Sequence, residues 1–370
     1  MSFIMNIRSV AKYESKILVR SWFFRIFTLL AVVFLGFFNF AMMLMEDNFG
    51  LWFAKSVSSN IPYLNLLLLN TGQAVVAVFL SSEFLKRDKK LDTSEVFYVR
   101  PLSNAEYVVG KIWGNLRVFL FLNLLVLAIV LAFNFMASGV TVDLPAYLVY
   151  FFLISIPTLI FIIGLSIFLM LLLKNQALTF ILLLGYIGLT LFYIQDKFYY
   201  LFDYMELILN HRAIYFFAGL GFIFFTIFLF KRLPNARRSH YPWLFLSFCM
   251  FLLMVTAGFR HVRSILWEGE MRALYTSINN KYVYEPKMAI DYYDISVEQK
   301  SETIRSVVGM EGTALAASEV FIFCLNPGLR VEEVKDGEKS LNFKREEQIL
   351  AVDFGRKIEK GDTISFSVSY

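Results

Sequence analysis

Residues 146–173 read AYLVYFFLISIPTLIFIIGLSIFLMLLL and contain no charged side chain. A helix that crosses the hydrocarbon core of a bilayer needs about 20 mostly apolar residues, and this run is longer than that. Similar apolar runs recur up to residue 259, so the sequence predicts an α-helical polytopic membrane protein with about seven spans. The expected spans are residues 22–45, 61–80, 112–135, 146–173, 177–194, 213–230 and 243–259.

The overall composition agrees with this class. Of the 370 residues, 58% are hydrophobic and only 18% are charged, whereas a soluble domain carries roughly 25% charged residues. The formal net charge of +5 comes from short basic clusters between apolar runs. Such clusters are typical of membrane topology signals, so the charge does not indicate nucleic-acid binding.

Lysine and arginine in short loops set the orientation of a membrane protein, with the basic loops in the cytoplasm. The basic-rich side carries Arg8, Lys12, Lys16, Arg20, Lys86, Arg87, Lys89, Lys90, Arg100, Lys111, Lys174, Lys231, Arg232, Arg237 and Arg238. The opposite loops carry only Lys55, Lys197 and Arg212. We therefore expect a cytoplasmic N-terminus in the inner membrane and, after seven crossings, an extracytoplasmic C-terminal domain. Arg260 and Arg263, just after the last span, argue weakly against this orientation.

Residues 1–21 predict an amphipathic helix that lies in the headgroup plane. Its basic residues recur every fourth position and face anionic lipid: Arg8, Lys12, Lys16 and Arg20. Its apolar residues lie mostly on the other side: Ile4, Ile7, Val10, Ala11, Ile17 and Leu18. Glu14 interrupts this apolar face.

A few polar side chains fall inside the expected spans. Arg25 and Arg117 lie near the cytoplasmic ends of their helices, where a long side chain can snorkel to the headgroups. In the second span, Asn70 and Gln73 are three positions apart and share one face of the helix, and Asn65 lies five positions before Asn70. These three residues are candidates for lining a conduit, but interhelical hydrogen bonding is the favoured explanation, because such side chains provide it in any helical bundle.

The loop at residues 81–111 reads SSEFLKRDKKLDTSEVFYVRPLSNAEYVVGK. Asp92 can cap a short helix with Glu95 in its first turn, and Pro101 ends that helix because proline disfavours helix in the residue before it. Ser103 and Glu106 then form a capping box that begins the next helix. The short helix carries apolar side chains at Val96, Phe97 and Tyr98. On a cytoplasmic loop these predict a docking surface for a cytosolic protein.

This loop resembles that of type-2 ATP-binding-cassette exporter permeases. The residues that carry the resemblance are Asp92, Thr93, Glu95, Pro101, Leu102, Ser103, Glu106, Tyr107, Gly110 and Lys111. The resemblance covers residues 1–240 and implies that 22–240 form a six-helix permease domain. It also implies a coupling helix that docks on an ATPase through Asp92, Thr93, Glu95, Val96, Phe97, Tyr98 and Pro101. The seventh span, 241–259, departs from the six-span family unit.

The chain contains no phosphate-binding P-loop sequence, since Gly110 and Lys111 are followed by Ile112. We therefore expect ATP to be used by a separate cytosolic ATPase and no cofactor to be bound by this chain. The resemblance also implies a homodimer or heterodimer of permease units in contact with membrane lipids.

Beyond a linker at residues 260–287, with helical character near 266–278, the chain predicts a β-sandwich at 288–370. The expected strands are residues 289–299, 303–313, 320–325, 329–334, 340–345, 349–354 and 363–370. Turn signals separate them at Asn326-Pro-Gly, Asp336-Gly and Lys360-Gly-Asp.

This tail is similar to the N-terminal β-domain of gluzincin-type zinc aminopeptidases. The matching stretches are FCLNPGLRVEEV at 323–334, GEKSLNF at 337–343 and GDTISFSVSY at 361–370. No HExxH sequence is present, and His211, His240 and His261 are isolated in the sequence, so we expect neither zinc nor peptidase activity. The resemblance implies a permease–aminopeptidase fusion of which this chain is the front part, whose last strand, 363–370, lacks a partner.

Two functions are consistent with these features. The first is a permease subunit of an export system, which explains the many spans and the docking loop. The alternative is a membrane-anchored extracytoplasmic peptidase-like or binding protein whose spans serve as an anchor. An anchor needs one span and no capped cytoplasmic helix, so the sequence favours the permease. It does not indicate the substrate.

Overall fold

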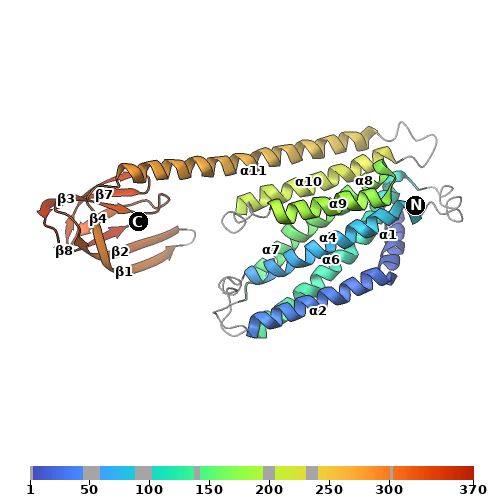
Figure 1. Ribbon diagram of the computed structural model, residues 1–370, viewed down its shortest axis with the longest axis horizontal. Coiled ribbons are helices and arrows are strands. Elements are labelled where there is room, and N and C mark those ends of the chain that lie inside the picture. Colours follow the sequence, from blue (N-terminus) through green and yellow to red (C-terminus); the bar gives the residue numbers. More distant parts are fainter. Residues whose placement is uncertain are drawn as a thin grey trace. The chain divides into compact units, whose positions relative to one another are not determined.

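The computed structural model describes residues 3–44, 59–87, 102–136, 142–194, 205–230, 241–300 and 303–370. Contacts within the chain divide it into two compact units, Met1–Val262 and Arg263–Tyr370. The first unit contains helices and the second contains the end of one helix and two β-sheets (Figure 1).

The helices of the first unit run along its length, with several side by side (Figure 1). They are α1 (Phe3–Arg20), α2 (Trp22–Leu44), α4 (Asn60–Arg87), α6 (Asn104–Met136), α7 (Leu144–Tyr150), η2 (Phe151–Ser155), α8 (Ile156–Leu173), α9 (Gln176–Leu189), η3 (Thr190–Ile194), α10 (Met205–Leu229) and α11 (Tyr241–Lys281). Within the described residues, six helical stretches are long and apolar enough to cross a membrane, and α9 is a shorter apolar helix. Each expected span coincides with one of these stretches.

Local sequence explains where α8 begins and where it meets α9. Pro157 has no N–H to donate to the carbonyl of the preceding turn, and the helix widens into the π-helical segment η2 just before it. Lys174 adopts a left-handed conformation with φ of 53° and ends α8. Asn175 then caps α9 by accepting a hydrogen bond from the Leu178 N–H. The short connection expected between the fourth and fifth spans is thus a tight helix–helix turn.

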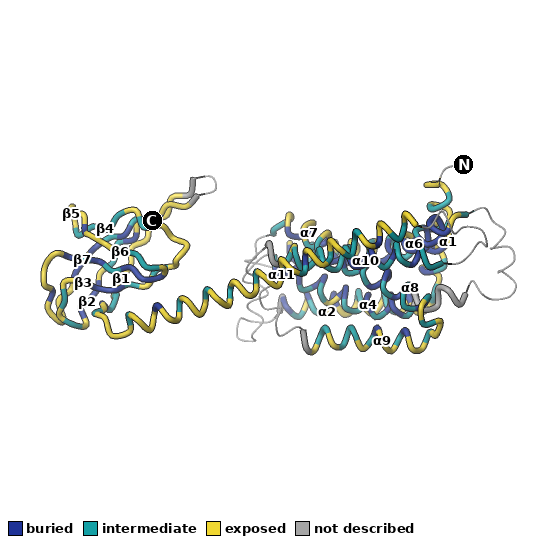
Figure 2. The backbone as a smooth tube through the Cα atoms, turned by 90° about the horizontal axis from the view of Figure 1, so that it is seen from above, coloured by how far each residue is buried: buried dark blue, intermediate teal, exposed yellow. Residues whose placement is uncertain are grey.

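Burial differs strongly between the helices. Two thirds of the apolar window of α4 is buried (67%), against 17% for α2 and 11% for α11. Figure 2 shows α2 with much of its surface exposed. Its outward side chains are large and apolar, for example Phe34, Phe37 and Phe40. Such a surface suits lipid contact better than water, so α4 lies at the centre of the helical unit and α2 at its periphery.

Most of the residues expected to form a linker, 260–287, are helical. Helix α11 continues without a break from Tyr241 to Lys281, although the boundary between the two compact units falls within it, between Val262 and Arg263. The reason is local: after Pro242 no proline occurs until Pro286, and the glycines Gly258 and Gly269 only weaken a helix. The helical character expected at 266–278 is confirmed.

The second unit contains two antiparallel sheets. One has five strands in the order β1-β2-β8-β4-β5 and the other has three in the order β3-β7-β6. The strands are β1 (Met288–Lys300), β2 (Thr303–Ala314), β3 (Ser318–Cys324), β4 (Glu333–Asp336), β5 (Lys339–Ser340), β6 (Asn342–Glu346), β7 (Ile349–Ile358) and β8 (Thr363–Ser369). Side chains from both sheets meet in one core, where Phe354 of β7 contacts Phe321 of β3 and Phe366 of β8.

Three strand expectations are corrected by this topology. Residues 329–332 precede β4 and do not belong to it, and the expected strand 340–345 is divided into β5 and β6. The last strand, expected to lack a partner, is β8, which pairs with β2 on one side and β4 on the other. Alternating apolar residues identified β8 as a strand, but its neighbours depend on chain connections that alternation does not determine.

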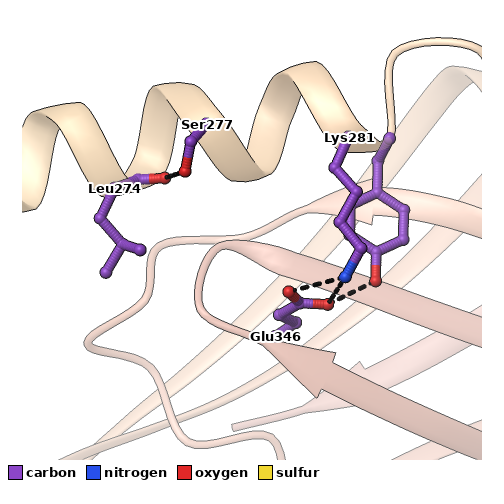
Figure 3. A network of polar contacts seen from close by, with 5 residues as sticks. Leu274, Ser277, Lys281 and Glu346 are labelled. Atoms are coloured by element: carbon purple, nitrogen blue, oxygen red, sulfur yellow. Dashed lines mark hydrogen bonds and ion pairs between the residues drawn. The ribbon is translucent and has the colours of Figure 1, made fainter.

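The end of α11 packs against the three-stranded sheet. Lys281 makes an ion pair with Glu346 at 2.8 Å (Figure 3), and the Tyr282 hydroxyl donates to the same carboxylate. One turn earlier, the Gln348 side-chain amide donates to Tyr275 O and Asn279 Oδ1. These contacts fix the last turns of α11 to the β-domain within one unit.

Candidate functional site

The residues expected to couple to an ATPase, Asp92, Thr93, Glu95, Val96, Phe97, Tyr98 and Pro101, lie outside the part of the chain that the structure describes. Their C-terminal flank is described from Leu102 onward. The first turns of α6 therefore show how the expected docking loop joins the helical unit.

The predicted capping box at the start of α6 is confirmed. The Glu106 side chain accepts from the Ser103 N–H at 2.6 Å and from the Ser103 hydroxyl at 2.9 Å. The Glu106 N–H donates to Ser103 Oγ at 3.2 Å. The other carboxylate oxygen of Glu106 accepts from the Asn6 side-chain amide at 2.8 Å. One residue thus caps α6 and ties it to α1.

A buried ion pair joins the same two helices. Glu14 Oε1 of α1 lies 3.3 Å from Lys111 Nζ of α6, and the two side chains are 5% and 2% exposed. Lys111 Nζ also lies 4.9 Å from the centre of the Tyr107 ring. Glu14, which interrupts the apolar face in the sequence, therefore belongs to the face of α1 that packs on α6.

Close backbone approach accompanies this ion pair. A Cβ atom at Gly110 would lie 2.7 Å from Val10 Cβ, and one at Gly114 would lie 2.8 Å from Ala11 O. Only glycine permits such an approach, and two small residues spaced by four positions are a common contact between membrane helices. The α1–α6 clamp, defined by Glu14, Lys111, Gly110 and Gly114, thus combines charge with tight packing.

Arg117 extends the clamp by one more turn. It donates to the Ser15 hydroxyl and to Ala11 O, the latter at 2.9 Å. Arg117, which was expected to snorkel to the headgroups, thus forms hydrogen bonds with α1. Arg25 donates to Val19 O at 3.0 Å and lies 6.0 Å from the Trp22 ring, at an exposed position near the junction of α1 and α2.

The start of α6 also contacts the end of α10. The Asn104 side-chain amide donates to the Phe230 carbonyl oxygen, and the Tyr107 ring stacks on the Phe230 ring with centroids 5.5 Å apart. The first turns of α6 thus contact both α1 and the end of α10, which are distant in sequence.

The basic residues expected to face lipid are exposed on α1. They are Arg8, Lys12, Lys16 and Arg20.

Deeper in the helical unit, the candidate conduit residues form hydrogen bonds between helices. Asn65 of α4 exchanges two side-chain hydrogen bonds with Asn39 of α2, at 2.7 and 3.1 Å. Asn70 donates to Asn123 Oδ1 of α6 at 3.2 Å and to Ser155 Oγ of η2 at 3.0 Å. Asn123 in turn donates to Gln73 Oε1 at 2.8 Å. All of these side chains are buried, which favours the hydrogen-bonding explanation over the lining of a conduit.

At the opposite end of α10, the structure brings together residues that are far apart in sequence. The rings of His211 and His261 lie 5.4 Å apart, and the His211 ring lies 5.0 Å from that of Tyr215. Two of the three histidines treated as isolated are thus neighbours; His240 lies outside the described residues. Arg212, counted as a loop residue in the sequence, belongs to α10 and lies 3.5 Å from Thr158 Oγ1. Across the described ranges, no group of three metal-ligand side chains includes this pair.

Sequence reasoning did not identify the α1–α6 clamp, although the Gly110–Gly114 spacing was a usable signal. The fold defines a class: a helical unit with stretches long and apolar enough to cross a membrane, followed by a β-sheet domain. No family model matches the chain, and no curated protein matches it.

Proposed function

We propose that this chain is the permease subunit of an ATP-binding-cassette export system. In this proposal a separate cytosolic ATPase docks on residues 92–101, and the chain itself is not an enzyme. The observation that carries the proposal is the α1–α6 clamp. It holds the helix that directly follows the docking loop with a buried ion pair, a capping box and backbone contact.

The clamp matters because movement of a docked ATPase has to reach the membrane helices through their ends. A loop joined to a loosely packed helix would absorb that movement locally. Here the first turns of α6 contact both α1 and the end of α10. The resemblance of residues 92–111 to the coupling segment of type-2 exporter permeases supports the same function.

The proposal includes a topology. The chain crosses the inner membrane seven times, with α9 and η3 forming the fifth crossing. The N-terminus is cytoplasmic, and the sandwich-like β-domain is extracytoplasmic. The basic side chains of α1 lie against anionic headgroups, and a second permease unit completes the transporter. The alternative is a membrane-anchored binding or peptidase-like protein, which leaves the clamp without a role.

The test is ATPase association. The tagged full-length chain is purified from membranes of its own host, and the eluate is assayed for ATP hydrolysis and for labelling of a soluble subunit by a photoreactive ATP analogue. Replacing Val96 and Phe97 by aspartate should remove both signals, because unpaired charges in an apolar docking groove are strongly unfavourable.

The matched control replaces Val283 and Tyr284 by aspartate, an apolar–aromatic pair in the second unit that is 47% and 98% exposed. This variant should keep both signals. The proposal fails if the unmodified chain carries no nucleotide-binding subunit, or if the Val96 and Phe97 variant retains it.

A further inference from the structure

Arg212 lies inside a helix that is long and apolar enough to cross a membrane. The candidate span of α10 runs from Ile208 to Leu229, so Arg212 lies about one helical turn inside its first residue. An arginine in such a segment is costly unless an acceptor or a counter-charge compensates it. The contacts of its guanidinium therefore decide what the residue does.

The protein groups around Arg212 compensate its charge only in part. Its Nη1 donates to Thr158 Oγ1 of the neighbouring helix α8 (Figure 1) at 3.5 Å, which is long for a hydrogen bond. Its Nε is buried and has no hydrogen-bond partner. Within the part of the chain that the structure describes, no carboxylate forms an ion pair with it. A buried donor without an acceptor is rare in proteins and indicates a group that binds there.

Snorkelling does not explain this arrangement. A side chain that snorkels places its charged group in the headgroup region, in contact with water. Arg25 shows what this looks like, since it is exposed and its Nε donates to the Val19 carbonyl oxygen at 3.0 Å. The Nε of Arg212 is buried instead, and its Nη1 contacts α8. The guanidinium of Arg212 is thus directed into the helical unit.

Other polar rings surround this guanidinium. The His211 ring lies 5.4 Å from the His261 ring of α11, and His211 is within electrostatic range of Arg212. Tyr63 of α4 and Tyr215 of α10 are also within electrostatic range of Arg212. We call this group the Arg212 cluster; its members are Arg212, His211, His261, Tyr63 and Tyr215. It draws on three helices of the first unit and contains no carboxylate.

The composition of the Arg212 cluster matches an anion with several oxygens. A guanidinium binds carboxylate or phosphate oxygens through two parallel N–H donors. A carboxylate uses both of its oxygens in that contact, whereas a phosphate has further oxygens for donors on other helices. Aromatic rings next to the cluster, such as Phe161 at 5.0 Å from the Tyr215 ring, lower the local dielectric and strengthen the attraction. The cluster therefore favours phosphate.

We propose that the Arg212 cluster binds a phosphate group, with the Arg212 guanidinium as the main donor. The phosphate belongs to a lipid headgroup or to a water-soluble compound, because the chemistry of recognition is the same for both. The bound phosphate supplies the counter-charge that the described part of the chain does not. This inference goes beyond the proposed transport function and does not depend on it.

The experiment measures thermal unfolding of the full-length chain, freed of native lipid by gel filtration in a non-ionic detergent. Inorganic phosphate, a short-chain phosphatidylglycerol and acetate are added in separate arms at equal ionic strength. We expect the unfolding midpoint to rise with the concentration of a phosphate probe, because a ligand that binds only the folded chain stabilises it. Acetate should produce no rise.

The two phosphate arms distinguish the sources of the group. A rise with inorganic phosphate supports the proposal and assigns the cluster to a water-soluble compound. A rise with phosphatidylglycerol alone supports it and assigns the cluster to a lipid headgroup.

Arg212→Gln is the decisive variant. It removes the charge, so it should abolish the rise with phosphate. Without a probe it should unfold at the same temperature as the unmodified chain or at a higher one, because an incompletely compensated charge has been removed. Arg212→Lys keeps the charge but loses the planar fork, and it should bind the phosphate probe about tenfold more weakly. The matched control is Arg25→Gln, at an exposed position of α2, which should respond to phosphate like the unmodified chain.

The proposal is overturned if neither phosphate probe raises the midpoint, if acetate raises it equally, or if Arg212→Gln retains the rise. An Arg212→Gln chain that unfolds at a lower temperature without a probe, or that does not fold, would also overturn it, by assigning Arg212 a structural role.

Discussion

Glu14 of α1 and Lys111 of α6 lie 3.3 Å apart, and both side chains have almost no exposure to solvent. The two residues are far apart in the sequence. A buried ion pair costs much of its Coulomb energy in desolvation, but either charge alone would be far more costly. The two residues therefore depend on each other, and their pairing requires α1 to remain on α6.

Replacing Lys111 by methionine should destabilise the helical unit by about 3 to 5 kcal/mol, because the Glu14 carboxylate is left buried without its partner. The measurement is thermal unfolding of the full-length chain in detergent. E14Q/K111M should recover most of the loss. The matched control is Arg305→Met, which breaks an exposed pair with Glu332 and should cost at most about 1 kcal/mol. Equal losses for the two single variants would contradict the role of burial.

Alanine at Gly114 should separate α1 from α6. The new Cβ would lie 2.8 Å from Ala11 O, and overpacking of this kind costs about 1 to 3 kcal/mol. Faster proteolysis within residues 3–20 would report the separation. Gly188→Ala in α9 is the control, because a Cβ there meets nothing within 4 Å. If both variants are cleaved at the same rate, the close approach does not hold α1 in place.

Features that depend on residues within one segment could be predicted from the sequence, whereas contacts between distant segments could not. Apolar runs located the spans, and the Ser103–Glu106 spacing located the start of α6, because both signals lie within one segment. The Glu14–Lys111 and His211–His261 contacts depend on which helices are neighbours, and no pattern within either segment contains that information. For the same reason, alternation identified β8 as a strand but did not indicate its neighbours, β2 and β4.

The contact between α11 and the β-domain should weaken in acid. The hydrogen bond from Lys281, and next that from Tyr282, lowers the pKa of Glu346 below its ordinary value of 4.5. A lowered carboxyl pKa stabilises the contact above the ordinary value, and this stabilisation is lost as the pH falls through the lowered one. The hydrogen-exchange protection factors of residues 275–282, corrected for the intrinsic exchange rate at each pH, should therefore fall below pH 4.5 in the unmodified chain. Glu346→Gln should show lower protection at neutral pH and little further change in acid, whereas Glu338→Gln should behave like the unmodified chain.

Asn123 should contribute more to stability than an asparagine with one side-chain partner. Leucine at position 123 removes bonds to Asn70, Gln73 and Ser155 and should cost about 1 to 2 kcal/mol. Leucine at Asn134, in the same helix, removes one bond to Tyr147 and should cost less. If the two variants unfold alike, the buried amides are not structural. A cysteine at Asn70 that reacts with a water-soluble thiol reagent would then favour the conduit alternative.

The last prediction concerns topology and rests on the distribution of lysine and arginine between alternate loops. In a chain with Cys249 and Cys324 replaced by serine, single cysteines at Lys89 and Asn235 should be shielded from an impermeant thiol reagent applied to intact spheroplasts. Cysteines at Asn48 and Asp336 should react. Permeabilised cells provide the control, since all four positions should then be labelled. Labelling of position 89 from outside would reverse the orientation. A β-domain that is labelled at 336 only after permeabilisation, with positions 48, 89 and 235 as expected, would show that the chain crosses the membrane an even number of times and that α11 does not span it.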